Sequence, residues 1–107
     1  MGEARFRVEV TERAAADLDE IDTYWTERGD AWRGEKYYND LREFALRELA
    51  DADQARRGRL LQDRRNPSVR SILAFGVYLI IYEIDETAAR VNVVRFWHSH
   101  RDIPPLE

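Results

Sequence analysis

The segment Val69–Asp102 constrains the fold more than any other part of the chain, because it holds nine of the thirteen valine and isoleucine residues. Its middle, Val77–Ile84, is apolar on both faces of an extended strand instead of at alternate positions. A strand of this kind is covered on both faces and therefore lies inside a sheet. The sequence predicts an antiparallel meander built around this strand.

The other predicted strands are covered on one face only. Arg5–Val10 alternates strictly between apolar and charged residues, which is typical of a half-buried strand. In Arg90–Trp97 the same two-residue period places Val94 and Phe96 on one face and Arg95 on the other. A group of polar residues then follows at the end of this last strand.

Two helices are predicted between the first strand and the meander. Thr11 is a suitable N-cap for the first, Gly29 ends it, and Asp30 can cap the second, which we expect from Ala31 to Ala52. Both helices carry an apolar stripe at helical spacing, formed in the first by Ala14, Leu18, Ile21 and Trp25, and in the second by Tyr38, Leu41, Ala45 and Leu49. The short turn between them predicts an antiparallel hairpin whose stripes pack on the sheet.

The expected order of elements is β-α-α-β-β-β, with one polar connection of any length at Asp51–Pro67. We predict an α+β fold in which the helix hairpin packs on a small antiparallel sheet. A chain of 107 residues is large enough for one core and too small for two. Residues 1–107 are therefore expected to form a single domain.

Charge is unevenly distributed along the chain. The net charge is −4, yet residues 56–70 carry six arginines against the single acid Asp63. The pI of about 5.3 argues against direct DNA binding by the chain alone, because nucleic-acid-binding domains are usually strongly basic. The chain has no cysteine, no apolar N-terminal leader and no run long enough to span a bilayer, so we expect a cytoplasmic protein that does not use a membrane.

Two groups of residues could carry chemistry. The arginines at 56–70 suit carboxylates or phosphates, although a solvated loop explains them equally well. His98 and His100 fall on one side of the last strand if it continues, but a third ligand at metal spacing is missing, so no metal site and no cofactor are predicted. Tyr78 and Tyr82 could stack on bases, but the two-sided central strand favours a place in the core.

Three segments carry a resemblance to a known family: TERAAADLDEIDTYWTERG at residues 11–29, FGVYLIIYEID at 75–85 and VVRFWHSHRD at 93–102. Together with the order of elements, they resemble the ParE branch of the RelE/ParE toxin superfamily over nearly the whole chain. Members of this superfamily are toxins of bacterial type II toxin–antitoxin modules. The resemblance implies a helix hairpin on an antiparallel sheet.

The resemblance also implies two partners: DNA gyrase, which characterised ParE toxins poison without known hydrolytic chemistry, and a ParD-like antitoxin that wraps the toxin in a hetero-oligomer. We expect toxicity to depend on the end of the last strand and the tail, at Arg95, His98, His100 and Arg101. The acidic amphipathic tail of the antitoxin is expected to contact the helix hairpin and the open sheet face, at Arg57, Arg64, Arg70, Trp25 and Tyr38.

The alternative implied by the superfamily is a ribosome-dependent messenger-RNA endoribonuclease of the RelE type. Its candidate residues here are His98 as general acid or base, with Arg70 and Arg95 on the phosphate. Two features oppose it: Ser99 stands where that branch often has a tyrosine, and the chain is net acidic, which suits the ribosome poorly. A third possibility is an inert member retained as an antitoxin binder or co-repressor.

Overall fold

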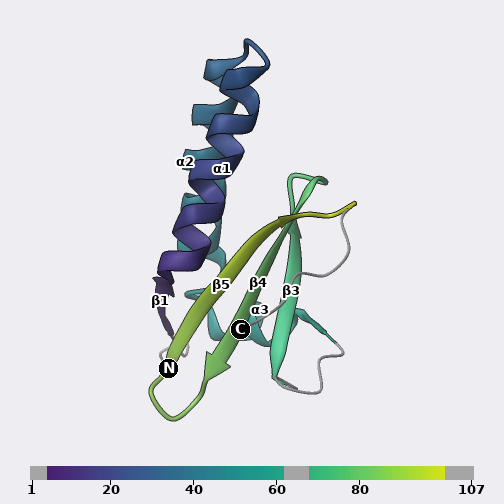
Figure 1. Cartoon of the computed structure of the whole chain (residues 1–107). Helices are drawn as coiled ribbons and strands as arrows, with labels where there is room; N and C mark the ends of the chain where they lie inside the picture. Colours follow the sequence, from purple (N-terminus) through teal and green to yellow (C-terminus); the bar gives the residue numbers. More distant parts are fainter. Residues whose placement is uncertain (1–4, 62–67, 101–107) are drawn as a thin grey trace.

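A computed structural model describes residues 5–61 and 68–100 and shows a helix hairpin beside a five-stranded sheet (Figure 1). Along the chain, the elements are β1 (Arg7–Val10), α1 (Glu12–Glu27), α2 (Ala31–Glu48), α3 (Ala52–Arg56), β2 (Arg59–Leu60), β3 (Val69–Ala74), β4 (Tyr78–Asp85) and β5 (Arg90–His98). The hairpin of α1 and α2 extends beyond the end of the sheet (Figure 1). The α+β class and the hairpin on a sheet are confirmed.

The sheet is mixed, with the strand order β1-β5-β4-β3-β2. Strands β2 to β5 pair antiparallel, as the meander requires, but β1 lies parallel to β5, with Arg7 opposite Arg90 and Val10 opposite Val93. The prediction of a purely antiparallel sheet is therefore wrong. A parallel pair needs a long crossover, and here the three helices and three strands between β1 and β5 supply one.

β4 lies in the middle of the sheet, as its apolar run predicts. Tyr78, Ile80 and Tyr82 are buried in the core that the sheet shares with the helices, which confirms the core position of both tyrosines. On the opposite face of β4, Ile81 is fully buried and Leu79 is half-buried. The strand is thus covered on its helix side throughout and on its other side in part.

A β-bulge in β5 changes which residues face the helices. Tyr82 pairs with Val93, but Ile81 pairs with Arg95, so Val94 has no partner of its own on β4. The extra residue in β5 shifts by one position the alternation of side chains between the two faces of the sheet. Val93 and Phe96 therefore both belong to the helix-side core, and the prediction that Val94 and Phe96 share a face is wrong.

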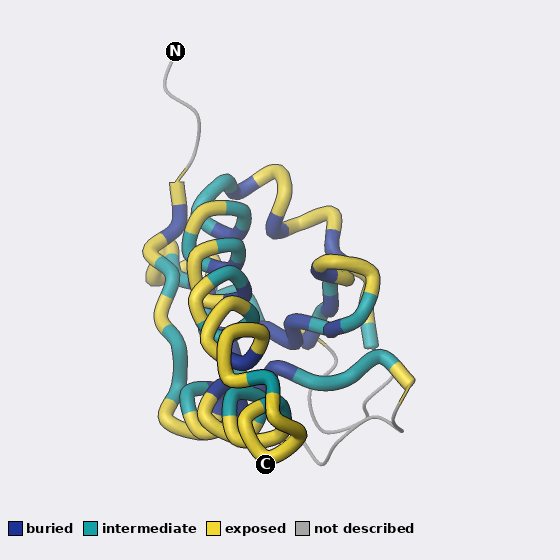
Figure 2. Tube along the Cα trace, turned by 90° about the horizontal axis from the view of Figure 1, so that it is seen from above, coloured by how far each residue is buried: buried dark blue, intermediate teal, exposed yellow. Residues whose placement is uncertain are grey.

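The predicted helix caps are present. The Thr11 hydroxyl accepts a hydrogen bond from the Ala14 amide, the Asp30 side chain accepts one from Arg33, and Gly29 adopts a positive φ of 81° just after α1. No helix in the described part of the chain is long and apolar enough to cross a membrane. Figure 2 shows that exposed residues line the outer turns of the hairpin, while buried ones lie toward the sheet.

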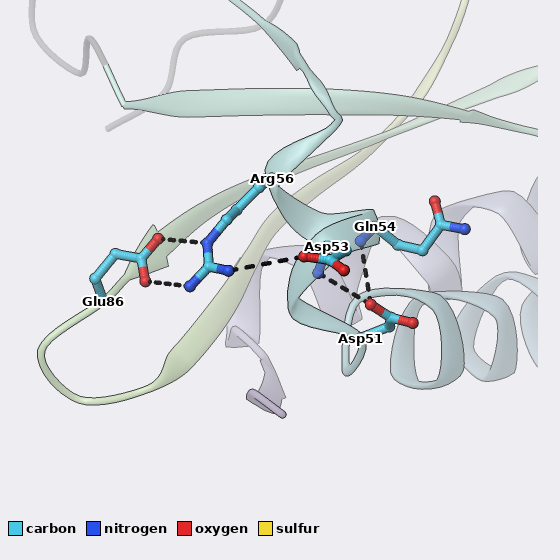
Figure 3. A network of polar contacts seen from close by, with 5 residues as sticks. All are labelled: Asp51, Asp53, Gln54, Arg56 and Glu86. Carbon is cyan, nitrogen blue, oxygen red and sulfur yellow. Dashed lines mark hydrogen bonds and ion pairs between the residues drawn. The ribbon is translucent and has the colours of Figure 1, made fainter. Parts of the chain in front are cut away.

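The second helix ends earlier than predicted, at Glu48, and the polar connection contains the short helix α3, which the sequence analysis missed. The Asp51 carboxylate starts α3 by accepting hydrogen bonds from the Asp53 and Gln54 amides. Arg56 then forms a two-bond contact with Glu86 in the β4–β5 turn, at 2.9 and 3.0 Å (Figure 3). The Arg56 guanidinium lowers the pKa of Glu86, and the pair fastens α3 to the sheet.

Asp17 forms the link between α1 and β5. Its carboxylate accepts hydrogen bonds from the Arg95 side chain at 2.7 and 3.0 Å and from the Phe96 amide at 3.1 Å. Asp17 is 4% exposed and Arg95 is 5% exposed. β1 ends at Val10, so the outer edge of β5 has no strand partner beyond Val93, and this carboxylate satisfies the edge amide instead.

Tyr82 links β4 to α3. Its hydroxyl donates a 2.6 Å hydrogen bond to the Ala55 carbonyl, and its side chain is fully buried. Burial raises the pKa of Tyr82 to about 12, against the opposing effect of the nearby Arg70 charge. The Tyr82 hydroxyl also fills the space beside Gly58, where any larger residue would collide with it.

Tyr82→Phe removes the bond to Ala55 and should lower the free energy of unfolding by about 1 kcal/mol at neutral pH. In the wild type the Tyr82 phenol loses its proton at a lower pH in the unfolded state than in the folded state. Its contribution to the free energy of unfolding is therefore fully present below pH 10 and is lost as the pH rises toward about 12. The variant should lack this contribution. Urea unfolding at neutral pH and at about pH 11 measures it, with exposed Tyr24→Phe as control; an unchanged alkaline loss in Tyr82→Phe would contradict the assignment.

Asp17→Ala leaves the buried Arg95 charge without a partner, and we expect it to destabilise the chain by about 3–5 kcal/mol. Asp19→Ala, which removes an exposed acid from the same helix, should change stability by less than about 0.5 kcal/mol. Thermal and urea unfolding measure both. If Asp17→Ala does not fold, the double variant Asp17→Leu/Arg95→Met should fold, because it removes both charges; equal stability of the two alanine variants would show that the pair is unimportant.

Candidate functional site

A cavity of the described structure lies where α1 and α2 meet the start of β4 and the end of β5. It has a volume of about 460 Å³, which is within the range of ligand and peptide-anchor sites. Most of its lining is aromatic or aliphatic: Ile21, Tyr24, Trp25, Tyr37, Val77, Tyr78, Phe96 and Trp97, with the two carboxylates of Asp17 and Glu20 and the imidazole of His98 completing it. We call it the aromatic cavity.

Ring contacts hold the walls of the aromatic cavity in place. Trp25 stacks on Tyr37 with 6.0 Å between ring centroids, and Tyr37 meets Tyr78 edge to face at 5.1 Å. The Trp25 indole donates a 3.3 Å hydrogen bond to the Tyr78 hydroxyl. These contacts join α1, α2 and β4, so the shape of the cavity depends on how the hairpin sits against the sheet.

His98 and His100 lie close together, but β5 ends at His98, and a turn at Ser99 brings them together instead of continued strand alternation. Their ring centroids are 5.2 Å apart, and the His100 amide donates a 3.1 Å hydrogen bond to Nδ1 of His98. Because Nδ1 accepts this bond, neutral His98 carries its proton on Nε2. His98 lines the aromatic cavity and its ring packs against Tyr78, whereas His100 is exposed.

Arg95, predicted both for target binding and for phosphate binding, is buried in its ion pair with Asp17. Its guanidinium also lies over the Trp97 ring, 4.7 Å from the centroid. The carboxylate of α1 therefore already binds this guanidinium, and direct contact between Arg95 and a target stays a prediction. Arg101 lies outside the described residues.

Two of the three arginines expected to meet the antitoxin lie in the described part of the chain, near the end of α3. Arg70 donates to the Gly58 carbonyl at 2.8 Å, while Arg57 is exposed at the end of α3. Arg64 lies outside the described residues. Trp25 is in the aromatic cavity, whereas Tyr38 lines a separate cleft of about 500 Å³, whose other residues are Asp19, Asp22, Thr26, Ala31, Glu35 and Asn39.

Residues 5–61 and 68–100 contain no group of three or more histidine, aspartate or glutamate side chains that could hold a metal ion. Of the eleven residues that line the aromatic cavity, sequence reasoning assigned only Trp25 and His98 to a binding site. Asp17, Glu20 and Tyr37 are among those it missed. Tyr37 lies next to Tyr38 at the edge of the apolar stripe of α2, so its place in the site could have been inferred. Asp17 gave no such signal, because five other acids accompany it on α1.

The comparisons with solved structures show the same fold. The chromosomal ParDE toxin–antitoxin system from P. aeruginosa matches with a TM-score of 0.73 and 20% identity, over 89% of this chain and 97% of that chain. The toxin–antitoxin complex RelBE2 from Mycobacterium tuberculosis matches with a TM-score of 0.66 and 22% identity, over 88% and 98%. None of the curated proteins compared with the chain matches it.

The family comparison covers most of the sequence. The model of the ParE toxin of the type II toxin–antitoxin system parDE matches residues 8–103. That range runs from β1 through β5 and includes every residue that lines the aromatic cavity. The chain belongs to the ParE toxin family of type II toxin–antitoxin systems.

Proposed function

We propose that this toxin inhibits DNA gyrase by binding it, and that a ParD-like antitoxin holds it inactive. Action on gyrase places the toxin in the cytoplasm, where its target works on DNA. We prefer gyrase to messenger RNA as the target because of one observation. An endoribonuclease would need Arg70, Arg95 and His98 at one point, and these residues are kept apart. General acid–base catalysis requires the proton-transferring group and the phosphate-binding groups at one point.

Those three residues do not converge. Arg95 is buried and paired with Asp17, and Arg70 is engaged by the Gly58 carbonyl. Arg70 lies opposite Tyr82 on β4, whereas His98 lies opposite Tyr78. Four residues along a strand and two strand spacings place the backbones of Arg70 and His98 about 16 Å apart. At this separation Arg70 does not reach a phosphate held by His98, and the nearer candidate, Arg95, is already bound by the Asp17 carboxylate.

The same positions are suited to binding. His98 presents its Nε2–H from the wall of an apolar cavity, and His100 is exposed beside it. Interfaces concentrate their affinity in a few well-packed aromatic and polar groups surrounded by weaker contacts. We therefore assign target binding to His98 and His100, together with Arg101, and give Arg95 the role of holding the strand that carries them.

An antitoxin partner is proposed on the family and on the neighbours, both of which come from toxin–antitoxin complexes. Among the sequence-predicted arginines, Arg57 is exposed and has no carboxylate partner in the part of the chain that the structure describes. It remains suited to a carboxylate of an acidic amphipathic tail, because arginine binds carboxylates in a two-bond geometry. The resulting assembly is a toxin–antitoxin hetero-oligomer.

The test is to express the toxin alone and to measure, with the same preparation, supercoiling by purified gyrase and cleavage of translated messenger RNA. We expect loss of supercoiling and intact messages. His98→Ala should weaken inhibition about five- to thirtyfold, equivalent to about 1–2 kcal/mol, because binding energy is spread over several residues. Exposed Arg42→Ala on the second helix is the matched control and should leave inhibition unchanged.

Cleavage of messages with supercoiling intact would replace this proposal by the endoribonuclease. Complete loss of cleavage in His98→Ala would then identify the general acid or base. Absence of both activities in a folded chain would contradict the gyrase proposal and favour the inert member.

A further inference from the structure

The aromatic cavity contains two carboxylates, which differ in burial and in partners. Of its two carboxylates, Asp17 is buried and already accepts three hydrogen bonds, from Arg95 and Phe96. Glu20 is exposed and has no hydrogen-bonding or ionic partner among residues 5–61 and 68–100. The cavity thus combines an apolar interior with one free negative charge at its solvent-exposed edge.

The surroundings of the cavity are also acidic. α1 carries six acids and one arginine, and the separate cleft on the hairpin is lined by Asp19, Asp22 and Glu35. Three guanidinium groups of the chain already lie over rings of the cavity: Arg28 over Tyr24 at 3.4 Å, Arg33 over Trp25 at 4.8 Å and Arg95 over Trp97 at 4.7 Å. None of these arginines lines the cavity itself, and all three show that its rings accept a guanidinium.

The arginines at residues 56–70 do not neutralise the acidic surface around the cavity. Arg56 is paired with Glu86, Arg70 with the Gly58 carbonyl, and both lie near the opposite end of β4 from the cavity. A partner that enters the cavity therefore meets negative charge, although a partner on Arg57 meets positive charge. The two contacts require opposite charges in the segments that reach them.

We propose that the aromatic cavity is the docking site for a basic anchor of the antitoxin: one large apolar side chain that fills the cavity, next to an arginine or lysine that pairs with Glu20. This inference rests on the proposed antitoxin partner and names the chemistry of one contact. The apolar side chain is stabilised by the aromatic walls, and the adjacent cation is stabilised by Glu20 and by the acidic surface of α1.

Three capped dipeptides serve as probes of the full-length toxin: acetyl-Phe-Arg-amide, acetyl-Phe-Gln-amide and acetyl-Phe-Glu-amide. Nuclear magnetic resonance follows the three tryptophan indole signals. Trp25 and Trp97 line the cavity, whereas Trp32 is 72% exposed at the start of α2 and serves as the internal reference. We expect saturable shifts of Trp25 and Trp97 alone, with the Arg probe binding about fivefold more tightly than the Gln probe and the Glu probe binding weakest.

Glu20→Gln should abolish the preference for the Arg probe while leaving the Gln probe unchanged. Asp19→Asn, the neighbouring acid that lines the separate cleft, is the matched control and should retain the preference. Equal affinities of the Arg and Glu probes, shifts shared with Trp32, or no saturable shift would overturn the proposal. Indole shifts that grow with toxin concentration alone would assign the cavity to a second copy of this chain and would also overturn it.

The measurement needs neither gyrase nor antitoxin, so it fails separately from the proposed function. If the toxin prefers the Arg probe but leaves gyrase active, the basic-anchor site is supported and the gyrase proposal is contradicted. If the toxin inhibits gyrase but binds all probes equally, the gyrase proposal is supported and the basic anchor is contradicted.

Discussion

The ion pair between Asp17 and Arg95 is the interaction on which the arrangement of this toxin depends. β1 is too short to cover the whole outer edge of β5, and the chain turns into α1 just after Val10. Thr11 takes over at that point by donating its amide and hydroxyl to the Val93 carbonyl, and Asp17 completes the edge at Phe96. A helix thus replaces a strand along one edge of the sheet. Two buried charges are tolerated because three hydrogen bonds satisfy the carboxylate.

This arrangement has two consequences for function. It holds α1 against the end of β5, so Trp25 reaches Tyr78 and the aromatic cavity forms between them. It also removes the Arg95 guanidinium from the surface. The side chain that most resembles a phosphate ligand in the sequence is therefore bound within the fold, and we propose that the cavity and His98 are what partners contact.

Local features of the fold could be predicted from the sequence, because each depends on neighbouring residues. Thr11, Gly29 and Asp30 mark helix ends through their own side chain or backbone conformation. The two-sided apolar run of β4 indicated its central position.

Features that depend on distant pairing could not be predicted in this way. The parallel contact of β1 with β5 joins residues more than eighty positions apart, and the bulge at Val94 appears only in the register with β4. Asp17 belongs to an acidic helix on which most acids face solvent, so its burial depends on a partner seventy-eight positions later. The aromatic cavity depends on both local and distant features. Its aromatic residues can be identified in the sequence, but the contacts between them cannot be predicted from it.

The most direct measurement of this account is amide hydrogen exchange of Phe96 in the wild-type toxin, compared with Ile80 in β4 and Thr87 in the exposed β4–β5 turn. If the Asp17 carboxylate binds this amide in the folded state, Phe96 should exchange as slowly as Ile80, within about tenfold, because both then open only with the core. Exchange of Phe96 at the rate of Thr87 would show an open edge at this point of β5. That result would contradict the central role of the Asp17–Arg95 pair.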